Sequence, residues 1–476
     1  MSSLTDPSEA GIIKRNLNMN ASTKLNRFSF IRAVTSVTGI AVTLLFALTN
    51  PARAQDKATL DLLVKKGVIS QSEEDSIAKS SAAVVVARDP DVQKLKVQGM
   101  VQFQYDWVTT KDKAPNSSDP PATNQFELRH IYLGAQADLG NGWGGEIQTD
   151  FAATGSTQLS AAPQSQNTQN SIEKAIITKK VDGYGLATFG FQKTQFSQEE
   201  NTLTSEILPV ERSIVTNYFT RPYGGPTIGR LGFGNRLAGI YWDGVVPGWN
   251  GFYYGDALTT DIETAASLGG PATGAPSYNE FGYWTHAGYQ GKLGDLAYKI
   301  GANFGYTGDA NSTPAAGPVP AQNNSIWGYN PYFSLSYDRF TLTAEFLQAI
   351  VQNGRASSGG VTSDAAPYGF VITPSYKIND QWELVTRLSE LSTNGRGATI
   401  SQQEWSGGNT AGAVSDYDNA LALYLGVNWY IEGNSVKLSA GYEYARFTDR
   451  QSVANGPFNG PGADVSAFRM RLQLMF

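Results

Sequence analysis

The stretch that decides the fold is the C-terminal one, residues 465–476, which read VSAFRMRLQLMF. Every second side chain on it is apolar: Phe468, Met470, Leu472, Leu474 and Phe476. Ala467, Arg469, Arg471 and Gln473 fall on the other face. A period of two is typical of a β-strand with one apolar and one wet face. The chain ends on this apolar face, with an aromatic residue and a free carboxylate.

The same alternation recurs from residue 95 onward. We predict strands at about 95–107, 125–139, 142–152, 171–181, 184–192, 235–243, 248–257, 280–293, 295–307, 326–338, 340–351, 367–378, 381–392, 418–431, 434–447 and 463–476. Pro331 and Pro374 fall inside two of these strands. Because proline cannot donate to a strand ladder, we expect a bulge at each of them.

The links between these strands alternate in length. The short links are 139–142, 181–184, 293–295, 338–340, 378–381 and 431–434. The long, Gly/Pro/Ser/Asn-rich links are 109–124, 153–170, 193–234, 258–279, 308–325, 352–366, 393–417 and 448–462. Outer-membrane barrels have short periplasmic turns, long external loops and an even strand number. We therefore predict an all-β membrane protein, an antiparallel transmembrane β-barrel of about 16 strands over 94–476, closed by its last strand against its first.

The composition agrees with a barrel rather than a helical membrane protein. Apolar residues make up 41% and charged residues 16% of the chain. No apolar run reaches the ~18–20 residues of a spanning helix. Cysteine is absent, which fits export through an oxidising periplasm without disulfides. With about sixteen strands the bore is too wide for side chains to fill, so we expect water in it.

The N-terminal 54 residues are typical of a cleaved secretory signal. Basic residues precede an apolar run over 33–48, and Ala52-Arg53-Ala54 is a cleavage site before Gln55. A start at Met19 would give a signal of ordinary length and make residues 1–18 a start-site artefact. We predict localisation in the bacterial outer membrane, surrounded by its lipid.

Residues 55–93 carry the one helical pattern of the chain. Leu60, Leu63 and Val64 share a helical face, and Ser70-x-x-Glu73 is a capping box for a second helix. We predict a short N-terminal helical hairpin and a linker in the periplasm, either as an oligomerisation element or as a solvated leader.

The longest link, 193–234, is the candidate functional loop, since loops of this size in compact folds are usually functional. Its bases are Lys193, Arg212, Arg221 and Arg230, and its acids are Glu199, Glu200, Glu206 and Glu211. The acids Glu199, Glu200 and Glu206 come first, and the bases Arg212, Arg221 and Arg230 follow. This order suggests two charged faces across a neck and mild ion selectivity. Arg469 and Arg471 on the last strand are either half of an anion ladder or pair with wall acids such as Glu443.

Two stretches resemble the phosphate-selective porin O and P family. Residues 190–197 (GFQKTQFS), continued by 202–205 and 211–213, are similar to that family's loop sequence, and 126–134 (FELRHIYLG) to one of its strands. The resemblance covers about 95–476. It implies a sixteen-stranded homotrimeric porin whose third external loop, 193–234, folds into the bore as a constriction.

Other function classes find little support. The two histidines, His130 and His286, lie in strands, so we expect neither a metal site nor a catalytic residue or cofactor. The chain is acidic (formal net charge −6), which disfavours nucleic acid as a partner. We predict a porin for small hydrophilic solutes or inorganic anions such as phosphate and no enzyme. A channel specific for a sugar or organic acid is the alternative, ahead of a barrel enzyme or gated receptor.

The terminal Phe476 resembles the signal read by the outer-membrane assembly machinery. We therefore expect that machinery as a partner of the unfolded chain.

Overall fold

The computed structural model describes residues 94–152, 172–221, 230–262, 281–308, 325–355, 363–400, 416–451 and 457–476. The predicted signal peptide (1–54) and helical leader (55–93) lie outside these residues. No helix within the described ranges has the length and apolar character needed to cross a bilayer.

The described residues form one antiparallel sheet of nineteen strands. Three of them are short: β12 (Ser363–Ala365), β15 (Ala398–Thr399) and β18 (Phe458–Gly460). The sixteen long ones are β1 (Lys94–Asp112), β2 (Thr123–Gly140), β3 (Trp143–Asp150), β4 (Ile172–Val181), β5 (Gly185–Lys193), β6 (Arg236–Val245), β7 (Phe252–Thr260), β8 (Phe281–Leu293), β9 (Leu296–Thr307), β10 (Ile326–Tyr337), β11 (Phe340–Arg355), β13 (Tyr368–Lys377), β14 (Trp382–Ser392), β16 (Asp416–Glu432), β17 (Val436–Gln451) and β19 (Ala463–Met475). The predicted strand number is confirmed, and the three short strands lie in links for which we predicted none.

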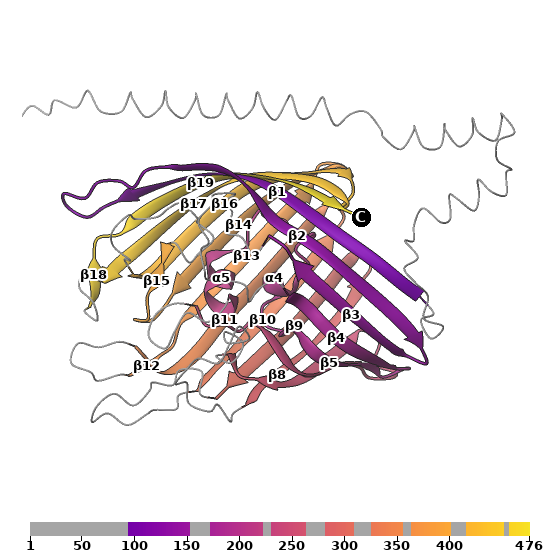
Figure 1. Ribbon diagram of the computed structural model, residues 1–476. Coiled ribbons are helices and arrows are strands. Elements are labelled where there is room, and N and C mark those ends of the chain that lie inside the picture. The colour runs from indigo at the N-terminus through magenta and orange to yellow at the C-terminus, as the bar shows by residue number, and fades with distance from the viewer. Residues whose placement is uncertain are drawn as a thin grey trace, which may run out of the picture. The chain divides into compact units, whose positions relative to one another are not determined.

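The sheet closes into a barrel where the chain's last strand meets its first. β1 pairs with β2 on one side and with β19 on the other, with Trp107 opposite Phe468. Figure 1 shows this seam as indigo β1 beside yellow β19. The backbone of Phe476 extends it, since its carbonyl accepts from Gly99 N at 2.9 Å and its N–H donates to Gly99 O at 3.1 Å. The closure predicted from the alternation of the last strand is thus confirmed.

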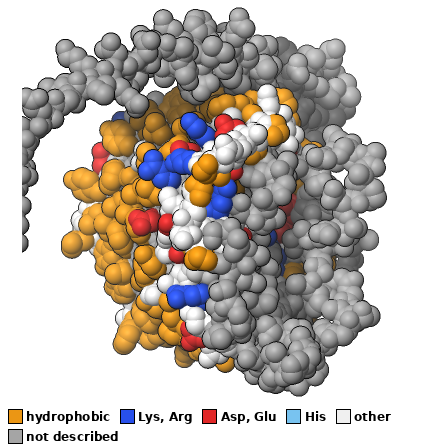
Figure 2. All heavy atoms as spheres, turned by 90° about the vertical axis from the view of Figure 1, so that its left-hand side faces the viewer, with side chains coloured by type: hydrophobic (Ala, Val, Ile, Leu, Met, Phe, Trp, Pro, Cys, Tyr) orange, Lys and Arg blue, Asp and Glu red, His pale blue; other side chains and the backbone are white. Residues whose placement is uncertain are grey.

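The two faces of the wall differ as the alternation predicts. Along β19, Arg469, Arg471 and Gln473 are buried inside the barrel, while Leu474 is exposed on the outer face. Large apolar side chains such as Leu423 and Leu425 cover the outer face of other strands. In Figure 2 hydrophobic side chains are massed on one side of the view, next to a strip of charged ones. An apolar outer face and a polar inner face are typical of a barrel that spans a bilayer.

The bulges that we expected at the two strand prolines are absent. β10 keeps one register on both sides of Pro331, with Tyr329 opposite Gln348 and Tyr332 opposite Glu345. β13 likewise pairs Pro374 with Leu342 of β11 without a shift. A strand has neighbours on both sides, so each proline interrupts hydrogen bonding toward one neighbour only, and the other ladder holds the register.

Candidate functional site

The loop between β5 and β6 contains two short helices, α4 (Gln198–Asn201) and α5 (Ile214–Thr220). Each begins with a serine that caps its first turn. The Ser197 hydroxyl accepts from Glu200 N at 3.2 Å, and the Ser213 hydroxyl accepts from Thr216 N at 3.0 Å. Hydroxyl side chains at this position satisfy backbone N–H groups that have no partner within the helix. The loop therefore has fixed local structure.

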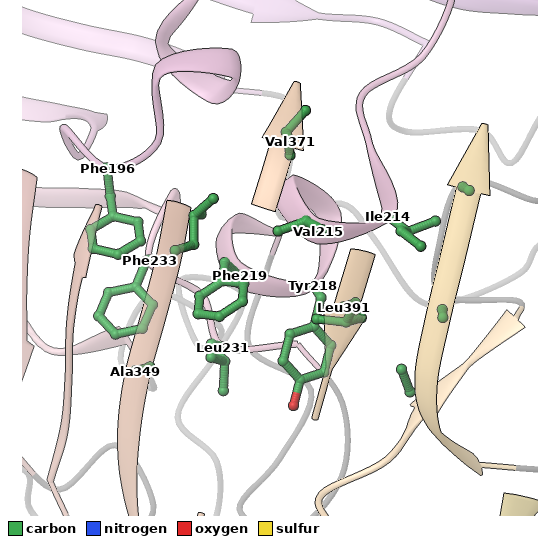
Figure 3. Packing of buried hydrophobic residues seen from close by; sticks show 14 of the residues in the cluster. Phe196, Ile214, Val215, Tyr218, Phe219, Leu231, Phe233, Ala349, Val371 and Leu391 are labelled. Atoms are coloured by element: carbon green, nitrogen blue, oxygen red, sulfur yellow. The ribbon is translucent and has the colours of Figure 1, made fainter. Parts of the chain in front are cut away.

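The loop packs against the inner wall of the barrel. Val215 and Tyr218 of α5 are fully buried, and α5 contacts β13 and β14, as Figure 3 shows for Val371 and Leu391. Further along, the ring of Phe233 stacks on Phe196 at 4.4 Å between centroids. Phe233 also meets Trp284 of β8 edge-on at 5.9 Å. Apolar contacts thus hold both ends of the loop inside the bore.

Glu345 of β11 holds the start of α4. Its carboxylate accepts from Ser197 Oγ at 3.0 Å, from Gln198 N at 2.8 Å and from Glu199 N at 3.1 Å. A carboxylate at the first turn of a helix is favourable, because it satisfies the free N–H groups there.

Arg387 of β14 connects the loop to two parts of the wall. It is 1% exposed and donates to Glu199 Oε1 at 2.8 Å and to the backbone oxygen of Glu211 at 2.7 Å. It also donates to Glu443 of β17 at 2.8 Å. Burial alone would raise the pKa of Glu199, but Arg387 and hydrogen bonds from Ser213 and Thr216 hold it below its usual value.

Glu211 is held by cations from β2 and β19, the strands on either side of β1. Arg129 of β2 donates to both of its carboxylate oxygens, at 2.7 and 3.1 Å, and Arg471 of β19 pairs with it as well. Gln104 of β1 donates to it at 3.1 Å. Burial would raise the pKa of Glu211, but the two arginines hold it well below its usual range. The loop acid therefore stays ionised and fastened to the seam of the barrel.

A bulge in β2 brings Arg129 to this place. β1 pairs Gln102 with His130 and Phe103 with Leu128, so Arg129 is the extra residue. Such a residue re-aims the side chains next to it. Arg129, which is half-buried, reaches Glu211, while the neighbouring His130 is buried and contacts Asp150 through Nδ1 at 2.5 Å.

For Arg469 and Arg471 the sequence left two alternatives, an anion ladder or ion pairs with acids of the wall. The structure shows both arginines in ion pairs. Arg469 lies 3.0 Å from Asp106 and 3.4 Å from Glu443, and Arg471 pairs with Glu211. Both arginines are 4% exposed. They are therefore part of a network of alternating charges, in which wall arginines face carboxylates.

From the order of the charges along the loop we expected two separate charged faces. The structure instead places acids and bases of the loop next to one another. Arg212 lies 3.0 Å from Glu200 and donates to the backbone oxygens of Glu200 and Thr202 at 3.2 and 3.1 Å. Lys193 pairs with the same Glu200. Acids and bases adjacent in space neutralise one another, so the loop charges mainly stabilise its fold.

The remaining predicted site residues are Arg221, Arg230 and Glu206. Arg221 follows α5 and donates to Asn217 at 3.2 Å. Arg230 lies where the described chain resumes after 222–229 and is half-buried. Glu206 is exposed on the loop.

Sequence reasoning missed the wall residues that receive the loop: Arg129, Glu345, Arg387 and Lys437. Glu345, Arg387 and Lys437 are charged residues at inward positions of predicted strands, and Arg129 is the extra residue of the bulge in β2. Lys437 is buried and donates to the backbone oxygens of Ser205 and Ile207 at 2.7 and 3.2 Å. A charged residue at mid-strand on the wet face was the available signal, but its partner across the bore is not readable from spacing.

Among the described residues no group of His, Cys, Asp and Glu side chains is placed to hold a metal ion.

The candidate site consists of a loop inside a barrel, fastened by charged and polar contacts to six or more wall strands.

A family model and several solved structures match the chain. A family model described as phosphate-selective porin O and P matches residues 97–476. The outer membrane channel DcaP of Acinetobacter baumannii is 12% identical with a TM-score of 0.51, covering 83% of this chain and 100% of that one. OprB of Pseudomonas putida is 12% identical (TM-score 0.48; 79% and 94% covered), and an anion-selective porin from Comamonas acidovorans is 11% identical (0.47; 80% and 99%). No curated protein matches the chain in sequence.

Proposed function

The chain belongs to the phosphate-selective porin O and P family, and from this membership we propose that it is a passive channel for small hydrophilic solutes and ions. The observation that carries the proposal is the loop inside the barrel. Sixteen long strands enclose a bore that side chains of the wall alone cannot fill. A loop fastened across such a bore narrows the water column, and a solute is then selected by size and by the charges at the neck.

The proposed channel has weak rather than phosphate-specific charge selectivity. An anion filter needs a ring of Lys or Arg whose charge is available to the solute. Here Arg129, Arg387, Arg469 and Arg471 all face carboxylates at hydrogen-bonding distance or in ion pairs. Their charge is therefore largely used to hold the loop and to join neighbouring wall strands, and the network offers little excess positive charge.

The proposed location is the bacterial outer membrane, where the apolar outer face of the barrel meets lipid. We expect export with a signal peptide cleaved before Gln55, insertion by the assembly machinery and assembly into a homotrimer. The matched family and the fold similarity to an outer membrane channel support this placement.

Planar-bilayer recording tests the proposal. Purified folded protein is expected to produce discrete current steps in KCl, with a zero-current potential in a salt gradient only slightly away from zero. Folded protein that produces no steps would contradict the channel function. A large anion-selective potential would contradict the weak selectivity.

A further inference from the structure

The segment between α4 and α5, residues 204–211, belongs to no helix or strand, and we call it the strap. Among the described residues its backbone–backbone hydrogen bonds are those of Glu206 N and Ile207 N with Leu203 O, at 2.8 and 3.1 Å. They close a turn and do not reach the wall. A segment held outside any sheet ladder can open while the surrounding barrel stays folded. The strap is therefore suited to be a moving part of the channel.

Side chains of the wall hold the strap carbonyls. Asn428 of β16 donates to Leu208 O at 3.0 Å. The ammonium of Lys437 donates to the carbonyl oxygens of Ser205 and Ile207 and, among the described residues, to no carboxylate. An ionised acceptor adds charge attraction to such a hydrogen bond. The strap therefore gives Lys437 weaker partners than an oxyanion would.

The end of the strap occupies further donors. The backbone oxygen of Glu211 accepts from Arg387, and its carboxylate pairs with Arg471. Gln473 of β19 donates to Ser205 O at 3.2 Å. In each of these contacts a wall group donates and a strap oxygen accepts. Strap oxygens thus cover a row of donors that suits an oxyanion.

Open space lies where the strap faces β11 and β13. A recess of ≈ 260 Å³ is lined there by Ile207, Leu208 and Pro209 of the strap and by Thr343 and Val371 of the wall. A segment can leave its donors only if it has room to move away from them. The recess provides that room.

From these observations we propose that oxyanions open the strap. Sulfate, phosphate or carboxylate groups compete with strap oxygens for the wall donors. A bound oxyanion shifts the strap toward the recess, because it binds only the conformation in which the strap has left the donors. The passage widens as the strap moves aside. The inference rests on the proposed channel function and adds a gate to it.

Single-channel recording with sulfate as the probe tests the gate. K₂SO₄ is added on both sides of the bilayer at constant KCl. The native channel is expected to enter a larger current level for a fraction of the time that rises and saturates with sulfate. Additional KCl of the same ionic strength is expected not to produce this level.

Ile207→Ala weakens the strap without touching the wall donors. Ile207 is 6% exposed, and truncation of a buried isoleucine costs more than the equivalent of a roughly tenfold change in an equilibrium constant. We therefore expect half-maximal opening at a sulfate concentration at least about tenfold lower than in the native channel. The matched control is Leu203→Ala in the same loop, which is 63% exposed and is expected to leave the sulfate dependence unchanged.

Two wall variants test the donors. Lys437→Met, added to Ile207→Ala, is expected to make the larger level frequent without sulfate and to weaken its dependence on sulfate. The strap then loses two hydrogen bonds, and the oxyanion loses its ammonium partner. Asn428→Ala removes one strap contact and no charge, and it is expected to lower the required sulfate even where Ile207→Ala does not fold.

The outcomes separate the gate from the channel. Native steps without a sulfate-dependent larger level would overturn the gate and leave the channel standing. The same holds if Ile207→Ala and Asn428→Ala both respond to sulfate like Leu203→Ala. Absence of any steps from folded native protein would overturn the channel proposal and the gate with it.

Discussion

Replacing Arg387 with Ala tests how the loop is held in the bore. The guanidinium donates to Glu199, to the backbone of Glu211 and to Glu443, at 2.7–2.8 Å, and is 1% exposed. Its removal leaves Glu199 without its cation, while Glu443 keeps Arg469 at 3.4 Å. Breaking a buried ion pair from one side costs about 3–5 kcal/mol. We expect the lower end, about 3 kcal/mol, because water in the bore can reach Glu199, whose side chain is 13% exposed.

The assay has two readouts. Urea unfolding in lipid vesicles, followed by tryptophan fluorescence, is expected to show the lost stability, and single-channel recording is expected to show larger or noisier steps as the loop loosens. Arg339→Ala is the matched control, because Arg339 is exposed in the link between β10 and β11 and donates to Ile378 O at 2.7 Å. Surface replacements of this kind change stability by about 0.5 kcal/mol. An Arg387→Ala protein that matches this control in both readouts would refute the role of Arg387.

A double-variant cycle with Glu199→Ala separates the contributions. If Arg387 acts through Glu199, the two replacements together are expected to cost less than the sum of their separate effects, since residues in one ion-pair network couple. Additive costs would mean that Arg387 acts through Glu443 and the backbone oxygen of Glu211 rather than through Glu199.

Three other predictions follow from the seam, the N-terminus and the loop acid. Deletion of Phe476, whose backbone makes two hydrogen bonds with Gly99, is expected to lower the heat-modifiable folded species far more than total synthesis; normal folded levels would contradict this. Mass spectrometry of the outer-membrane form is expected to find Gln55 at the N-terminus, and retention of residues 33–48 would defeat the prediction. The pKa of the Glu211 carboxyl is lower in the folded protein than in the unfolded chain, where it is about 4.3. The ionised carboxylate therefore stabilises the fold fully at any pH above the unfolded pKa. This stabilisation is lost only as the pH falls through the lower pKa of the folded protein. The single-channel conductance is therefore expected to stay constant from pH 7 to pH 5 and to rise in stronger acid. The Glu211→Gln variant is expected to lack this rise in conductance. A rise that already occurs at pH 6 would exclude Glu211 as its cause.

The barrel was predictable because its signals are local. Alternation along 465–476 and short links such as 139–142 depend on residues close in sequence. Asn141 and Gly142 have positive φ (51° and 79°), the backbone conformation that these residue types favour in tight turns. The first and last residues of the individual strands were less predictable. β7 begins at Phe252 rather than near 248, because the residues before it form a turn instead of extending the ladder.

The contacts of the loop were not predictable, because they join residues far apart in sequence. Arg387 meets Glu199 across 188 positions, and Arg471 meets Glu211 across 260. Periodicity assigns Arg387 and Arg471 to the wet face of their strands but gives them no partner in the loop. Arg129 adds a second difficulty, since only the bulge, which alternation does not show, decides that it and His130 both point inward.

The single-channel conductance of a shortened loop tests the central claim most directly. Residues 196–210 include α4 and the carboxylates of Glu199, Glu200 and Glu206, and a short Gly–Ser link can replace them within the same barrel. If the loop narrows the bore, this variant is expected to show current steps clearly larger than those of the native protein in the same KCl solution. Steps of equal size from a folded variant would mean that the loop does not line the narrowest part of the channel.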